Sequence, residues 1–179
     1  MREFKNKSGS FYRYMVKDIK HLTILCLLFN GNLVFANRIA QLAKWIEYLN
    51  DPKRKTPSMY TPINPLTAPC LPTLDDAWLA GFTDAEGCFN IYLAKSKVAR
   101  LRFILDQKDG QIQLGWIRDL FGFGNVRARS STIYRFVVSD IKGQVYVCDY
   151  FRKFPLKTKK QTSFKLWLEA CQLISNKQH

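Results

Sequence analysis

The chain has 179 residues, 47% of them hydrophobic, which suits one complete domain plus part of another. Its 28 lysines and arginines outnumber 14 acidic residues, and the net charge of +14 favours a polyanionic partner, either nucleic acid or an anionic membrane surface. No apolar run reaches the ~20 residues of a membrane span, so we expect no membrane partner. The five cysteines, odd in number and without a C-x-x-C pair, argue against a disulfide framework, and the presence of only two histidines argues against histidine-based metal or catalytic clusters.

The first 50 residues predict a strand followed by two helices. Aromatic and β-branched residues are enriched over 11–18, which is typical of a strand. Residues 21–29 and 34–49 read as helices that are separated by Asn30-Gly31-Asn32. Residues 51–73 hold six of the seven prolines and predict an extended linker.

An internal repeat links the two ends of the chain. Residues 12–47 align without gaps to residues 134–169, with roughly ten of 36 positions identical, and such self-similarity predicts duplicated architecture. Each aligned segment contains one tryptophan, and these two residues, Trp45 and Trp167, occupy the same position of the alignment. We therefore expect a C-terminal remnant of a first repeat over 1–50, a linker over 51–73 and a complete repeat over 74–176.

The segment from Leu79 to Gly87 predicts a helix with one face of small residues. Glycine inside a helix costs about 1 kcal/mol relative to alanine, so Gly81 needs a reason. Ala77, Gly81 and Ala85 recur at every fourth position and share one face. Such a face allows a second helix to approach closely.

Glu86 lies at the end of this helix, just before Gly87. A carboxylate is unfavourable beside the unpaired carbonyls at the negative end of a helix dipole. A divalent cation reverses the sign of that interaction, and oxygen ligands of this kind suit Mg²⁺. The position therefore predicts a magnesium site.

The residues after Gly87 alternate between apolar and polar types, which indicates strands. The expected order is two strands, a helix, two strands and two helices, an α+β arrangement with helices on one face of an antiparallel sheet. The segments are 88–93, 101–105, 111–121, 125–130, 132–139, 140–152 and 158–174.

The uncovered face of this sheet is expected to be basic and to contact DNA. Arg100 with Arg102, and Arg127 with Arg129, lie two residues apart and so share a face. Arginine pairs with guanine, and asparagine or glutamine with adenine, in the major groove. The other side chains that we assign to this face are Asn90, Tyr92 and Gln107. The alternation around Arg135 does not decide which face it occupies.

The stretch WLAGFTDAEGCF, from Trp78 to Phe89, resembles the signature of the LAGLIDADG homing endonucleases. The resemblance implies the αββαββα fold of that family and Mg²⁺-dependent hydrolysis of double-stranded DNA. It also implies that Glu86 and the Ala85 carbonyl hold the metal. Asp84 is a weaker metal candidate, and we expect it to cap or hydrogen-bond.

Family active sites also contain a polar residue from the second strand and a lysine later in the domain. By resemblance these are Gln107, which would order water, and Lys157, which would offset phosphate charge. A solvated or phosphate-contacting role for Lys157 stays equally open.

Family members have one motif and dimerise, or two motifs in one chain. This chain has one motif and the tail of a preceding repeat, so it needs either a homodimer through the Ala77, Gly81 and Ala85 face or the missing first-repeat segment. Two alternatives to the nuclease stay open, a maturase that binds intron RNA and an inactive remnant. Relatives of this type are typical of introns in mitochondria and chloroplasts.

Overall fold

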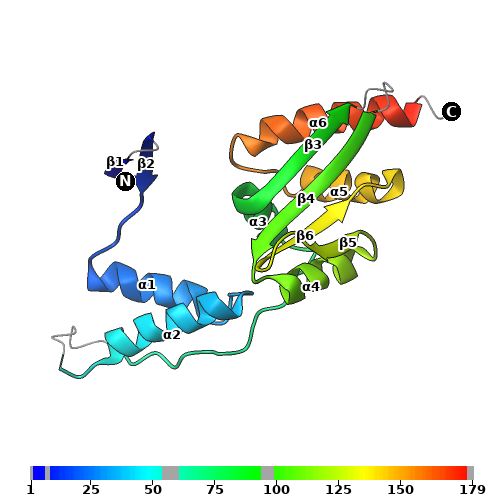
Figure 1. Cartoon of the computed structure of the whole chain (residues 1–179). Coiled ribbons are helices and arrows are strands. Elements are labelled where there is room, and N and C mark those ends of the chain that lie inside the picture. Colours follow the sequence, from blue (N-terminus) through cyan, green and yellow to red (C-terminus); the bar gives the residue numbers. More distant parts are fainter. Residues whose placement is uncertain (1, 7–8, 54–60, 94–98, 177–179) are drawn as a thin grey trace. The chain divides into compact units, whose positions relative to one another are not determined.

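The computed structural model describes residues 2–6, 9–53, 61–93 and 99–176, which form two compact units, Met1–Cys70 and Leu71–His179 (Figure 1). Within the described residues, no helix combines the length and the apolar character needed to cross a bilayer.

The first unit contains a hairpin and two helices. Strands β1 (Arg2–Asn6) and β2 (Gly9–Arg13) pair antiparallel, and helices α1 (Ile19–Phe29) and α2 (Ala36–Asn50) follow. The strand is shorter than the predicted 11–18 because it ends at Arg13 with the hairpin. The core of this unit is small, consisting of Cys26, Leu42, Ile46, Leu49 and Ile63.

Helix α1 begins like a helix of the second unit. The Asp18 carboxylate accepts the backbone N–H of His21 at 3.1 Å, and the Asp140 carboxylate accepts that of Gly143 at 2.6 Å. Aspartate is a favoured N-cap because it satisfies a backbone donor that the helix leaves unpaired. Both aspartates hold the same position in the aligned repeat.

The described part of the Pro-rich segment packs along the two helices of the first unit. The Asn50 side chain bonds both the C=O and the N–H of Ile63, at 2.8 and 3.0 Å. The Asn30 side chain bonds the C=O of Asn64 and the N–H of Leu66, both at 2.8 Å. Residues 54–60 of the predicted linker lie outside the described residues.

The second unit has the predicted α+β order and forms one antiparallel sheet, β3-β4-β6-β5. Each element matches a predicted segment to within a few residues. The elements are α3 (Trp78–Glu86), β3 (Gly87–Leu93), β4 (Ala99–Lys108), α4 (Gln111–Phe121), β5 (Asn125–Ala128), β6 (Ile133–Val138), α5 (Ile141–Lys153) and α6 (Lys160–Asn176).

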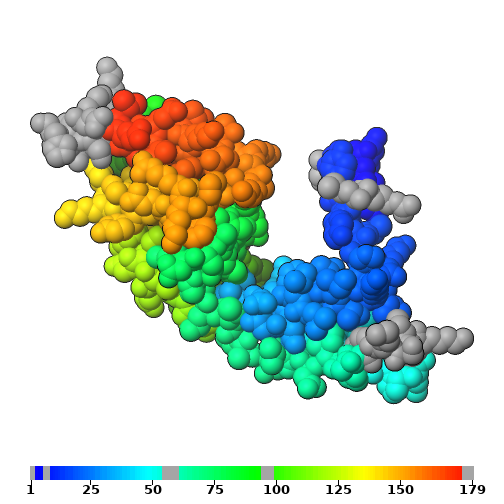
Figure 2. All heavy atoms as spheres, turned by 180° about the vertical axis from the view of Figure 1, so that it is seen from behind, coloured from blue at the N-terminus to red at the C-terminus, as the bar shows by residue number. Residues whose placement is uncertain are grey.

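Helices cover one face of this sheet. In Figure 1 α3, α5 and α6 lie behind the strands, and the view from behind in Figure 2 shows α5 and α6, orange to red, over that side. Alternate strand residues point toward the helices and bury aromatic and aliphatic side chains, which supply the main favourable free energy of folding. The largest of the buried residues are Trp167, Phe103, Phe136, Phe151, Leu79 and Leu105.

Candidate active site and nucleic-acid interface

Helix α3 passes into β3 without a loop, and Gly87 makes this possible. A Cβ at position 87 would lie 2.5 Å from Thr83 Cγ2 and 2.8 Å from the Thr83 carbonyl oxygen. The φ of −78° is ordinary, so the glycine is required by close approach and not by a left-handed backbone. As a result Glu86, the last helical residue, stands at the edge of the sheet and is exposed.

Tyr150 of α5 anchors the other end of α3. Its hydroxyl donates to the Asp76 carbonyl at 2.8 Å and accepts the Ala80 N–H at 3.2 Å. The Ala80 N–H is in the first turn of α3, where backbone donors lack intrahelical partners. Burial raises the pKa of Tyr150 to about 12, so the hydroxyl keeps its proton for the bond to Asp76.

Asp84 joins α3 to the segment before α6. Its carboxylate accepts the N–H of Lys157 at 2.7 Å, and the N–H and hydroxyl of Thr158 at 3.2 and 2.6 Å. Burial raises the pKa of Asp84, but the bonds from Thr158 and Lys157 outweigh it, and the net pKa lies below the ordinary value. Asp84 therefore has the hydrogen-bonding role that we expected, as an ionised acceptor.

Lys160 reaches the end of α3. Its Nζ donates to the carbonyls of Thr83 at 3.2 Å and Ala85 at 3.0 Å. Sequence reasoning selected Lys157, whose side chain is exposed and, within the described residues, forms no ion pair. Lys160 was missed because its partners are more than 70 residues away in sequence. No local pattern signals such a contact.

Gln107 lies near the same edge of the sheet, but not on the arginine face. Gly87 pairs with Leu105, and Gln107 follows two residues later, opposite Tyr134. Residues two apart share a face, so Gln107 is on the side of Leu105, which the helices cover. The expectation that it joins the arginines is therefore wrong. Gln107 and Arg102 lie an odd number of positions apart along β4, so their side chains point to opposite faces of the sheet.

The strand register brings the other predicted DNA-binding residues together. Asn90 pairs with Arg102 and Tyr92 with Arg100. Arg135 of β6 pairs with Arg127 of the neighbouring strand β5, and it also pairs with Asp106 of β4, the other neighbouring strand. These pairs lie on the side of the sheet that the helices leave open. Arg129 follows the end of β5, and its backbone N–H bonds the Ile133 carbonyl at 2.8 Å.

Two arginines on this face are held by neighbouring side chains. The Asn90 oxygen accepts from Nε and Nη2 of Arg102 at 3.2 and 2.9 Å. Asp106 accepts from Nε and Nη2 of Arg135 at 2.7 and 2.6 Å. The Arg135 hydrogen bonds hold the pKa of Asp106 below its ordinary value, and Asp106 raises the pKa of Arg135. The sequence left the face of Arg135 open, and the register decides it.

The small-residue stripe of α3 is exposed. Ala77, Gly81 and Ala85 all face solvent, and a Cβ at Gly81 would meet nothing within 4 Å. Ala77 is the N-cap and not an interior helical residue. Trp78 and Phe82, which flank this stripe, stack on each other with ring centroids 5.2 Å apart and pack against the core.

A family model described as LAGLIDADG endonuclease matches residues 79–171, more than half of the chain. The chain belongs to this family. Probable intron-encoded endonuclease 4 of Neurospora crassa is 34% identical over 171 residues, which cover 93% of this chain and 30% of that protein. The chain thus spans less than a third of the length of this relative.

Two solved LAGLIDADG structures resemble the chain. The meganuclease I-AabMI bound to uncleaved DNA is 26% identical, with a TM-score of 0.55, over 57% of this chain and 38% of that one. The homing endonuclease I-GzeII in complex with its DNA target has a TM-score of 0.58 at 22% identity, over 89% of this chain and 59% of that one. The fold described above is therefore the LAGLIDADG fold.

The oxygen donors at the end of α3 are of the kind that Mg²⁺ prefers. Among the described residues, no three His, Cys, Asp or Glu side chains gather where they would bind a metal. Glu86 is exposed and directly follows Ala85, whose carbonyl accepts a hydrogen bond from Lys160 Nζ at 3.0 Å in this structure. Mg²⁺ is commonly bound by one or two carboxylates together with water and substrate phosphates, and the end of α3 offers one such carboxylate.

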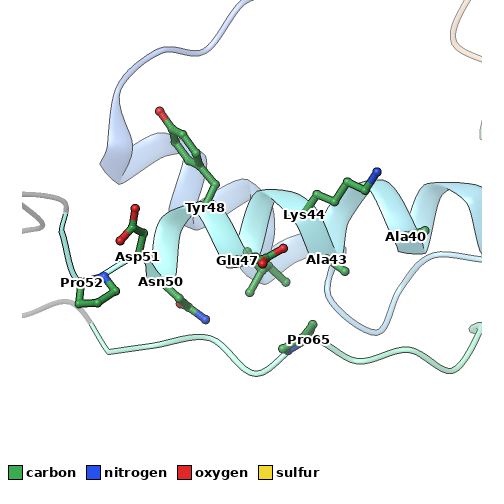
Figure 3. A pocket seen from close by; sticks show the side chains of 10 residues that line it. Ala40, Ala43, Lys44, Glu47, Tyr48, Asn50, Asp51, Pro52 and Pro65 are labelled. Atoms are coloured by element: carbon green, nitrogen blue, oxygen red, sulfur yellow. The ribbon is translucent and has the colours of Figure 1, made fainter.

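The first unit contains a separate open pocket of about 1000 Å³ (Figure 3). It lies between α2 and the packed Pro-rich segment, and Lys44, Glu47 and Asp51 are among the residues that line it. None of the sequence-predicted site residues of the LAGLIDADG motif belongs to it.

Proposed function

We propose that this chain is part of an intron-homing LAGLIDADG endonuclease that hydrolyses phosphodiester bonds of double-stranded DNA with Mg²⁺. One observation carries the proposal: an exposed acid, Glu86, ends α3 at the edge of a sheet whose open face is lined with arginines. DNA lying on that face would bring a phosphate to the acid. The relative named as intron-encoded supports an intron as the source, and an intron of a mitochondrion or chloroplast is the source that we propose.

Each site residue has a proposed role. Glu86 and the Ala85 carbonyl would hold Mg²⁺, which when bound lowers the pKa of water and neutralises the leaving oxygen. Gln107 would order the water at this edge. A lysine at the start of α6 would offset phosphate charge. The sequence favours Lys157, whereas the contacts favour Lys160.

Duplex DNA is a better match to the sheet than duplex RNA. The major groove of B-DNA admits a two-stranded ribbon and displays a distinct pattern for each base pair. The major groove of A-form RNA is deep and narrow, and side chains do not read it. Asn90, Tyr92, Arg100, Arg102, Arg127 and Arg129 would contact the DNA. Intron RNA, the partner of a maturase, is the competitor to include in binding assays.

Cleavage of both strands needs a second metal-binding acid. One α3 supplies one such acid, so a second α3 must lie against the Ala77, Gly81 and Ala85 face. It would come from a second copy of this chain or from a first repeat, of which residues 1–50 are the C-terminal remnant, joined by 51–73 to the repeat over 74–176. The shared aspartate caps at Asp18 and Asp140 support the duplication.

Replacing Glu86 by Gln tests the nuclease assignment. In a protein that contains both repeats, we expect Glu86→Gln to cut an intronless target about a hundred-fold more slowly or worse, because the metal loses its one charged ligand here. Gel-shift affinity for the same DNA should stay unchanged.

Glu169→Gln is the matched control, because Glu169 is an exposed acid of α6 and the charge change is identical. It should cleave at the normal rate. Normal cleavage by Glu86→Gln would refute the assignment, and a preference for intron RNA over duplex DNA would favour the maturase.

A further inference from the structure

An acidic residue occupies the middle of the arginine face. Asp106 of β4 lies directly opposite Arg135 of β6, which lies opposite Arg127 of β5, so the three form one row across the sheet. Arg129 also reaches Asp106, with 2.7 Å between Nη1 and Oδ2. A carboxylate repels the phosphates that this face is proposed to bind, and its presence there therefore needs a reason.

The geometry fixes Arg135 more firmly than Arg129. Asp106 accepts from both Nε and Nη2 of Arg135, a paired arrangement that defines the plane of the guanidinium. The Arg135 side chain is 19% exposed, whereas that of Arg129 is 56% exposed and makes a single contact with Asp106. The orientation of the Arg135 guanidinium is therefore fixed, whereas Arg129 is held to Asp106 by a single hydrogen bond.

The pairing leaves part of the Arg135 guanidinium available. Arginine has five N–H donors, and Asp106 uses one on Nε and one on Nη2. The remaining donors of Nη1 and Nη2 form a second fork at the far end of the group. Such a fork matches the O6 and N7 acceptors of guanine in the major groove.

The charges also favour a base over a phosphate. The carboxylate beside Arg135 offsets its positive charge and repels an approaching phosphate, while a neutral base edge suffers no such repulsion. Arg127 differs, since within the described residues it forms no ion pair and retains its full charge for the DNA backbone.

We propose that Asp106 is a positioning residue that makes Arg135 a reader of guanine in the major groove. The inference rests on the proposed DNA-binding function and adds to it a base preference at one position. Arg102 offers a comparison within the same sheet, because its partner Asn90 supplies a neutral oxygen and leaves its charge in full.

Selection from a random duplex library tests the proposal. The full chain is equilibrated with the library, and the bound DNA is sequenced. For the unmodified chain we expect one position with a strong guanine preference. Asp106→Asn should reduce that preference about ten-fold, because the fixed plane is lost. Binding to unrelated duplex DNA should not weaken, because a negative charge is removed.

Asp119→Asn is the matched control, since Asp119 also pairs with an arginine, at 2.7 Å from Arg118, but on α4. It should leave the guanine preference intact. A second variant, Arg135→Gln, should change the preference at that position from guanine to adenine. A misfolded protein does not produce a new preference.

The outcomes separate the two proposals. If the unmodified chain enriches no sequence, both the DNA-binding function and the role of Asp106 are overturned. If it enriches a sequence whose guanines respond neither to Asp106→Asn nor to Arg135→Gln, only the role of Asp106 is overturned.

Discussion

Lys160 donates from Nζ to the carbonyls of Thr83 and Ala85 at the end of α3. A cation at the C-terminal end of a helix is stabilising, and here it also lies next to the proposed metal position. We expect Lys160→Met to slow cleavage about ten-fold or more, because the charge that offsets the phosphate is lost while the side-chain stem remains. Single-turnover cleavage assays measure the effect.

Lys157→Met is the comparison, since the Lys157 backbone and not its side chain contacts Asp84. Loss of activity in Lys157→Met alone would return the role to Lys157. The sequence predicted Lys157, and the choice between Lys157 and Lys160 depends on how the segment docks on α3.

At the level of single residues, the position of the motif was readable from sequence. Glu86 ends α3 and Asp84 accepts hydrogen bonds, as the sequence predicts, while the metal-binding role of Glu86 stays a prediction. Arg135 and Asp106 were not readable as a pair, because their meeting depends on the register between β4 and β6. The error on Gln107 had a local cause: its parity along β4 was available in the sequence and argues for the covered face.

Helix α3 has a face that the chain leaves open around Gly81. Gly81→Ala should stabilise the fold by about 1 kcal/mol, because alanine favours helix and meets no neighbour. It should also weaken association with a second α3, because the added methyl keeps the two backbones apart. Thermal unfolding and sedimentation equilibrium measure the two effects.

Gly115→Ala is the control for Gly81→Ala. Gly115 is inside α4, and a Cβ there would also meet nothing within 4 Å. It should raise the melting temperature in the same way and leave association unchanged. Equal association by both variants would argue against the α3 face as an interface.

The elements of the second unit were predictable because the spacing of their apolar residues indicates helix or strand and because their ends are marked by residues such as glycine. The apolar alternation after Gly87 and the glycine at position 122, which adopts a left-handed φ of 73°, indicate where strands begin and α4 ends. The hairpin at the N-terminus was not predictable in extent, since β2 pairs with β1 and its length follows from that partner.

At the scale of the whole molecule, the aligned repeats differ in what they bury. Phe151 and Trp167 are 1% and 0% exposed in the second unit. Their counterparts Phe29 and Trp45 are 43% and 52% exposed. In the second unit these side chains pack against the core beneath the sheet. The first unit holds the corresponding helices without such a sheet, in keeping with the proposed remnant of a first repeat.

Phe29→Ser therefore should improve the solubility of the isolated chain but lower the stability of a two-repeat protein. The isolated chain should stay monodisperse to higher concentration, because an exposed apolar patch is reduced. A protein containing both repeats should lose about 1.5–3 kcal/mol of stability, because a buried phenylalanine is removed. Light scattering and denaturant unfolding measure these outcomes.

Leu173→Ser is the control, because Leu173 is an exposed apolar residue of α6 in the complete repeat. It should leave the stability of the two-repeat protein unchanged. Equal stability of Phe29→Ser and the parent would contradict the proposed first repeat.

Asn30 and Asn50 each present both a donor and an acceptor to the passing Pro-rich segment. An amide side chain can do this because it has the same two groups as a peptide unit, whereas an ionised aspartate only accepts. The course of the connection is thus specified from outside it, by two side chains on the preceding helices. These bonds involve only backbone groups of the connection, and its side chains are constrained elsewhere, at Ile63 in the core of this unit.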